Sequence, residues 1–72
     1  MDHVINSLEP FYEVNLRIVA DEYKSGAYED FTECPTYKEL KALVDAMNSL
    51  YEYVGWKELN IHEEFLVELA RN

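Results

Sequence analysis

The chain has 72 residues, with 15 Asp and Glu against 6 Lys and Arg, so its formal charge is −9. This length leaves room for one domain over 1–72, and an apolar content of 49% excludes a disordered chain. Domains below roughly 70–80 residues often need a disulfide, a metal or a second chain for stability. Because a single Cys cannot form an internal disulfide, we expect association with a partner or with a second copy.

The negative charge also limits the classes of partner. It repels phosphate backbones and anionic lipids, so we expect no direct nucleic-acid binding and no membrane binding. The sequence shows no signal-peptide pattern and no apolar run of about 18 residues, and a lone Cys34 suits a reducing compartment. These features predict a cytoplasmic protein that attracts a larger protein with a basic surface.

Residues 3–24 predict a first helix, with Asp2 as a candidate N-cap. One apolar stripe recurs every three or four residues and is formed by Ile5, Leu8, Tyr12, Leu16, Val19 and Tyr23. A second apolar stripe lies beside it, and the two stripes together are wider than two further helices, one of them short, are expected to cover. We therefore expect an exposed patch of Val4, Phe11, Val14 and Ile18. Pro10 favours a kinked or two-part helix over a helix that starts at Pro10. Alternation of apolar and polar residues leaves a strand over 12–19, in an α+β fold, as the alternative.

Two more helices follow a connection over 25–35, in which Gly26 is predicted to end the first helix. Thr36 and Glu39 have the spacing of a capping box at the start of a helix over 37–54, which Gly55 ends. Asn60 is predicted to cap a third helix that reaches about residue 71. We expect Ile61, Phe65, Leu66 and Leu69 to face inward and Glu64, Glu68 and Arg71 to face outward. The predicted fold class is all-α: a small antiparallel three-helix bundle with a long acidic loop between helices 1 and 2.

The sequence contains no recognisable motif for catalysis, cofactor binding or metal binding. His3, Cys34 and His62 stand alone, whereas zinc sites use paired ligands at short spacing. The adjacent acid Glu33 raises the pKa of a thiol and so argues against Cys34 as a nucleophile. We therefore expect a protein without enzymatic activity, catalytic residues, cofactor or metal.

The segment 21–33 carries five acids against Lys24 alone, so almost half of the net charge lies in thirteen residues. Aromatic residues are interleaved with these acids, and aromatic side chains are enriched among interface hot spots. The predicted partner-binding residues are Asp21, Glu22, Tyr23, Tyr28, Glu29, Asp30, Phe31 and Glu33. In the opposing interpretation, Tyr28 and Phe31 fold back into the core and the acids are merely solvated.

These features predict a small acidic binding protein that docks on a larger, nucleic-acid-handling protein and inhibits or regulates it. Phages and mobile elements encode many small acidic inhibitors, including inhibitors of bacterial defence nucleases such as anti-CRISPR proteins. In a phage protein, the compartment would be the host cytoplasm, and the carboxylates could act as a mimic of DNA phosphates. The alternative is a structural or assembly protein: an obligate homo-oligomer, in the simplest case a homodimer, that pairs through the exposed patch of helix 1.

Overall fold

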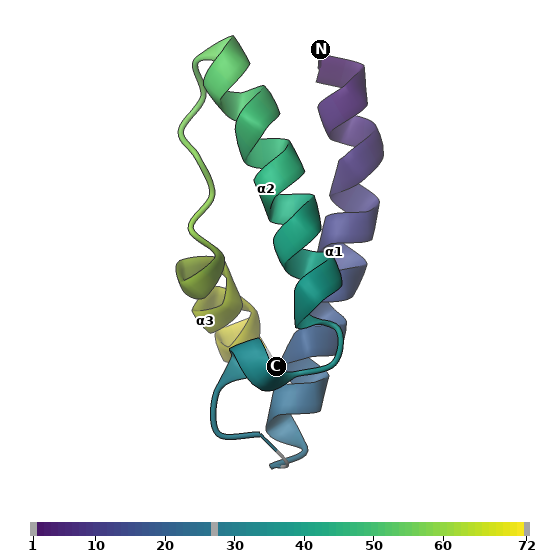
Figure 1. The fold of residues 1–72 in the computed structure, drawn as a ribbon, viewed down its shortest axis with the longest axis vertical. Helices are drawn as coiled ribbons and strands as arrows, with labels where there is room; N and C mark the ends of the chain where they lie inside the picture. The colour runs from purple at the N-terminus through teal and green to yellow at the C-terminus, as the bar shows by residue number, and fades with distance from the viewer. Residues whose placement is uncertain (1, 27, 72) are drawn as a thin grey trace.

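The computed structural model describes residues 2–26 and 28–71, with the side chains of residues 3–26 and 28–71. This part of the chain is all-helical, with α1 (Asp2–Lys24), the short 3₁₀ helix η1 (Phe31–Glu33), α2 (Tyr37–Val54) and α3 (Ile61–Arg71). α1 and α2 lie side by side along the long axis, and α3 lies beside the half of the bundle nearest η1 (Figure 1). The all-α prediction and the helical bundle are therefore confirmed.

α1 passes through Pro10 without a break. The two-part form of this helix is therefore wrong, and so is the alternative strand over 12–19. Proline removes one backbone hydrogen bond and disfavours a helix interior. Burial of the apolar face of α1 outweighs this local cost, since Ile5, Tyr12 and Leu16 on both sides of Pro10 are buried. The predicted N-cap, Asp2, lies outside the described side chains.

The core lies where all the helices meet. Its buried side chains are Tyr12, Leu16, Val19, Ala20, Phe31, Cys34, Leu40, Val44, Met47 and Phe65. Because an α-helix rises about 1.5 Å per residue, the 11 residues of α3 span only half the length of the 23 residues of α1. At the far end of the bundle α1 packs on α2 without α3, and Ile5 is fully buried there.

The predicted helix ends are correct, but one predicted cap is wrong. Gly26 and Gly55 follow α1 and α2 with left-handed backbones, at φ +82° and +81°. The Asn60 side chain accepts a hydrogen bond from the Glu63 amide at 3.1 Å, as expected for an N-cap. Thr36 precedes α2 without capping it through its side chain. The Thr36 hydroxyl instead donates to Glu22 of α1 at 2.8 Å, a long-range partner that the capping-box spacing does not reveal.

The inward face of α3 is rotated from the one predicted. Leu66, expected inside, is 52% exposed, whereas Glu68, expected outside, is buried. The rotation brings the Glu64 carboxylate to 2.9 Å from the Tyr12 hydroxyl, which donates a hydrogen bond to it. Helix periodicity does not define the direction of an apolar face more closely than one side chain. The hydrogen bond between Tyr12 and Glu64 favours the observed rotation of α3.

Candidate functional site

Phe31 fixes the loop 25–35 to the rest of the molecule. Its ring stacks on Phe65 of α3, with centroids 4.3 Å apart and planes 11° apart, and meets the ring of Tyr37 edge-on at 5.4 Å. Only 8% of Phe31 is exposed. Phe31 was predicted as a contact for a partner, but its ring is occupied by the protein's own core. Its role in any site is to hold the neighbouring acids in position.

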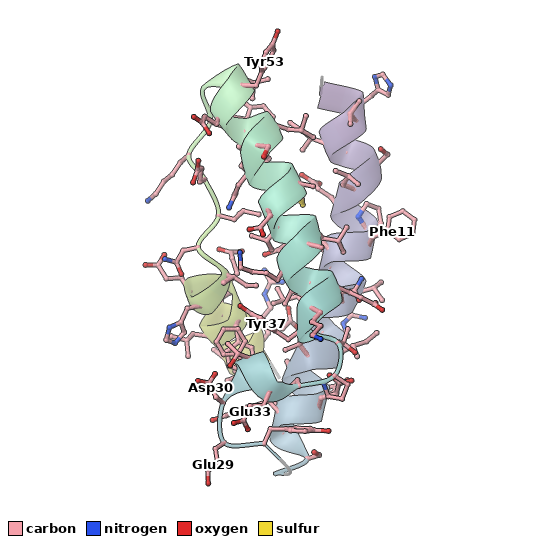
Figure 2. The ribbon with its side chains drawn as sticks, viewed as in Figure 1. Phe11, Glu29, Asp30, Glu33, Tyr37 and Tyr53 are labelled. Carbon is pink, nitrogen blue, oxygen red and sulfur yellow. The ribbon has the colours of Figure 1, made fainter. Side chains whose placement is uncertain are left out.

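Glu29, Asp30 and Glu33 are exposed at the end of the molecule opposite Tyr53 (Figure 2). The Asp30 carboxylate caps η1 by accepting a hydrogen bond from the Thr32 amide at 3.0 Å. The Glu33 carboxylate accepts a longer one, at 3.4 Å, from the Glu29 amide. These short-range bonds tie the Asp30 and Glu33 carboxylates to the local backbone, while the Glu29 side chain projects from the same anchored segment.

The remaining residues of the predicted site occupy different surroundings. Asp21 is exposed on the last turn of α1, whereas Tyr28 is half-buried against the core. Glu22 is held inside the fold because its carboxylate accepts hydrogen bonds from both the amide and the hydroxyl of Thr36, at 3.1 and 2.8 Å. Tyr23 is half-buried and packs edge-on against Phe65, with ring centroids 5.3 Å apart.

An open hollow of about 500 Å³ lies between the loop 25–35 and α3, and we call it the α3–loop hollow. Its aromatic and aliphatic lining consists of Tyr23, Phe31, Phe65, Leu66 and Leu69. Its polar lining consists of Glu29, Asp30, Thr32 and His62. The structure thus brings Tyr23, Glu29, Asp30 and Phe31 of the predicted site together, whereas Asp21, Glu22, Tyr28 and Glu33 do not line the hollow.

The contribution of α3 to this hollow was not foreseen from the sequence. The sequence pattern directs Leu66 and Leu69 toward the core, and it leaves His62 as an isolated ligand type. Leu66 is exposed and Leu69 is half-buried, so both lie at the edge of the apolar face of α3. Helix periodicity in a sequence indicates the centre of such a face more clearly than its edge. The ring of Phe31 places the loop next to these α3 residues, because it stacks on Phe65 and lies with its centroid 5.7 Å from that of His62.

A second exposed surface runs along α1. Val4, Phe11, Val14 and Ile18 form this outer stripe, and their exposed fractions of 39–63% confirm the predicted uncovered patch. Phe11 projects away from α2 and α3 (Figure 2). These four residues are separated by seven, three and four positions, so they lie on one face of the helix. Such a face can pack against another helix.

Tyr12 and Glu64 connect α1 to α3 at a smaller hollow of about 200 Å³, which Arg17, Glu68 and Arg71 also line. Burial and the hydrogen bond to Glu64 raise the pKa of the Tyr12 phenol, so its proton stays on the oxygen. Arg71 approaches the buried Glu68 carboxylate at 4.0 Å. The Tyr12–Glu64 hydrogen bond joins α3 to α1, whereas the Arg71–Glu68 pair lies within α3, and we assign both to the fold.

Cys34 lies in the core with its sulfur 3.7 Å from the carbonyl oxygen of Val19. Burial raises the pKa of its thiol, and the carboxylates of Glu22, Glu33 and Asp30 raise it further. A thiol held in its neutral form is a poor nucleophile. Within residues 2–26 and 28–71, no three or more His, Cys, Asp or Glu side chains come together in a way that would hold a metal ion.

The described helices are also too short or too polar to span a bilayer. Comparison of the chain with models of protein families, with curated proteins and with solved structures finds no match.

Proposed function

We propose that this chain is a small acidic binding protein without enzymatic activity. It docks on a larger, nucleic-acid-handling protein through a basic surface of that protein, and thereby inhibits or regulates it. The observation that supports this proposal best is the group of exposed carboxylates of Glu29, Asp30 and Glu33 beside the α3–loop hollow. A charged surface next to an apolar one provides both attraction at a distance and contact area after docking.

The charge distribution favours an electrostatically steered encounter. The net charge of −9 attracts a basic surface over a distance of about a Debye length, roughly 8 Å at physiological salt. The Phe31–Phe65 stack positions the loop before the partner arrives. Because residues 28–35 already have defined positions, ordering them on binding costs less conformational entropy.

In this proposal the helices form an antiparallel bundle, and the long acidic loop between helices 1 and 2 is the docking face. The chain acts in the cytoplasm, and in the host cytoplasm if a phage encodes it. Inhibitors of bacterial defence nucleases, including anti-CRISPR proteins and mimics of DNA, are the class with this combination of small size and acidity. This assignment rests on analogy of size and charge, together with the exposed carboxylates.

A capture experiment with bacterial lysate tests the proposal. The bait is the intact chain, and the variant is Glu29→Gln, Asp30→Asn and Glu33→Gln, in which each side chain keeps its size and its acceptor oxygen. We expect the intact chain to retain a basic, nucleic-acid-binding protein that elutes as salt rises. The variant should bind this protein at least tenfold more weakly, because three charges facing the partner are removed.

The matched control neutralises three exposed acids elsewhere, as Glu39→Gln, Glu52→Gln and Glu58→Gln, and so changes the net charge equally. Binding should survive in this control. Equal loss in both variants would show that only the total charge matters, and capture that is independent of salt and of the loop would contradict the proposed docking face.

The outer stripe of α1 supports a second candidate function, an obligate homo-oligomer. Its four exposed apolar side chains lie on one helix face, where a second copy of α1 can pack. Light scattering in dilute solution at moderate and high salt separates the two candidates. A stable dimer that loses mass on Phe11→Glu substitution supports the assembly function, whereas a monomer at both salt concentrations excludes it.

A further inference from the structure

We infer that the α3–loop hollow receives an arginine side chain of the partner, an inference that rests on the proposed function. The hollow offers two kinds of surface within one volume of about 500 Å³. Glu29 and Asp30 contribute carboxylates, while Tyr23, Leu66 and Leu69 contribute aromatic and aliphatic surface. Arginine has the matching parts, since it joins an apolar stem to a planar cationic head.

The charge of the lining selects a cation. Glu29 and Asp30 are the lining residues with a formal charge, and both side chains are exposed. One oxygen of Asp30 already accepts the Thr32 amide, but a carboxylate offers about four acceptor positions. The Asp30 carboxylate can therefore still receive N–H donors of a guanidinium, and Glu29 adds a second negative charge to the lining.

The apolar part of the lining favours arginine over lysine. The ring of Tyr23 is half-buried and that of His62 is exposed, so the hollow presents aromatic surface. A guanidinium is planar, weakly hydrated and stacks on aromatic rings, whereas an ammonium is compact and strongly hydrated. Leu66, which is about half exposed, gives the aliphatic stem a contact that removes apolar surface from water.

A titration with N-acetyl-arginine methylamide tests the inference without the partner. Spectra of the methyl groups report on Leu66 and Leu69, which line the hollow, while the methyl groups of Val4 and Val14 on α1 serve as internal controls. We expect saturable shifts at the two leucines, with a dissociation constant of roughly 1–10 mM for so small a ligand. The corresponding citrulline compound, which has nearly the same shape but no charge, should bind at least tenfold more weakly.

Substitutions at exposed positions keep the fold and change the hollow. Leu66→Lys places a cation in the lining and should weaken binding of the arginine compound at least tenfold. Leu66→Glu adds an anion and should preserve or strengthen binding. Val67→Lys is the matched control, because Val67 is equally exposed but lies outside this hollow. An amide spectrum of each variant verifies that it is folded.

The titration tests both the identity of the ligand and the location of its site. Equal affinity for the citrulline compound, or for N-acetyl-lysine methylamide, would overturn the assignment of arginine. Shifts away from the hollow, or binding that Leu66→Lys leaves intact, would overturn the location. Partner capture that survives Leu66→Lys but fails in the triple loop variant would leave the proposed function standing without the arginine site. Arginine binding without partner capture would contradict the proposed function alone.

Discussion

Phe31 shows how one side chain determines the position of an entire charged segment. In the sequence it lies between Asp30 and Glu33 and resembles an aromatic contact for a partner. In the structure its ring stacks on Phe65 and is almost completely buried. The interpretation in which Phe31 folds back into the core is therefore correct. The buried ring anchors the segment that carries the exposed acids.

Substitution of Phe31 by Ala should destabilise the protein by about 3 kcal/mol, because removing a buried aromatic ring leaves a cavity. The effect is measured by urea unfolding followed by circular dichroism. Phe31→Leu, which refills most of the volume, should lose less than half as much. If Phe31→Ala unfolds at the same urea concentration as the intact chain, the stacked ring does not stabilise the fold.

The raised pKa of Tyr12 predicts that the protein loses stability in alkaline solution. Its phenol pKa is raised above the ordinary value of 10.0, first by burial and then by the hydrogen bond to Glu64. Below pH 10 the folded and unfolded chains both keep this proton. Above it only the unfolded chain releases the proton, so the free energy of unfolding falls by about 1.4 kcal/mol per pH unit at most for this group.

Tyr12→Phe should flatten this decline, as measured by unfolding between pH 9 and pH 11. A residual slope remains because burial also raises the pKa of Tyr51 and of Cys34. A slope that is equal in the Tyr12→Phe variant and in the intact chain would contradict this account.

At the scale of the elements, α1 contains a conflict between local and tertiary preferences. Pro10 opposes a helix interior, yet α1 is a single helix of 23 residues. The buried side chains on both sides of Pro10 keep the two parts in line. Such a conflict cannot be resolved from local propensity, because the compensating contacts come from α2 and α3.

Pro10→Ala should raise the free energy of unfolding by about 1 kcal/mol or more, since it restores a backbone donor within the helix. Thermal unfolding measures the gain. Asn6→Ala, at an exposed position in the same helix, is the control for helix propensity and should contribute only about 0.5 kcal/mol. A Pro10→Ala variant that is less stable than the intact chain would mean that Pro10 is required for the shape of α1.

At the scale of the whole molecule, α3 is too short to complete the bundle. The molecule measures 38 × 21 × 18 Å, and α3 covers only the half near η1 (Figure 1). The N-terminal half of α1 therefore packs on α2 alone, and the outer stripe stays exposed along the helix because the apolar arc of α1 is wider than its neighbours cover. Small domains bury a limited fraction of their surface, so exposed apolar stripes of this kind raise the expectation of a partner.

The two faces of α1 should respond differently to the same substitution. Phe11→Gln and Val14→Gln together should change the free energy of unfolding by no more than about 1 kcal/mol, since both side chains are more than half exposed. Leu16→Gln, on the buried face, should cost several kcal/mol because it places an amide in the core. Chemical unfolding of each variant measures both effects, and similar losses on the two faces would contradict the orientation of α1.

Periodicity and turn residues in the sequence predict the three α-helices, but neither the continuity of α1 through Pro10 nor the 3₁₀ helix η1. The apolar spacing of residues 37–54 and the glycines at 26 and 55 predict two helix ends correctly, because positive backbone angles and amphipathic spacing are local properties. The exposed stripe of α1 was predicted for a related reason: its apolar arc is wider than two neighbouring helices cover. The charge of −9 follows directly from composition.

Only the tertiary structure decided which charged and aromatic residues share a surface. It placed Phe31 against Phe65, bonded Glu22 to Thr36 and turned Leu66 outward beside Glu29 and Asp30. These contacts join residues that are far apart in the chain, and each depends on side-chain packing between elements. Local sequence patterns specify the helices, whereas the candidate docking surface exists only where the loop and α3 meet.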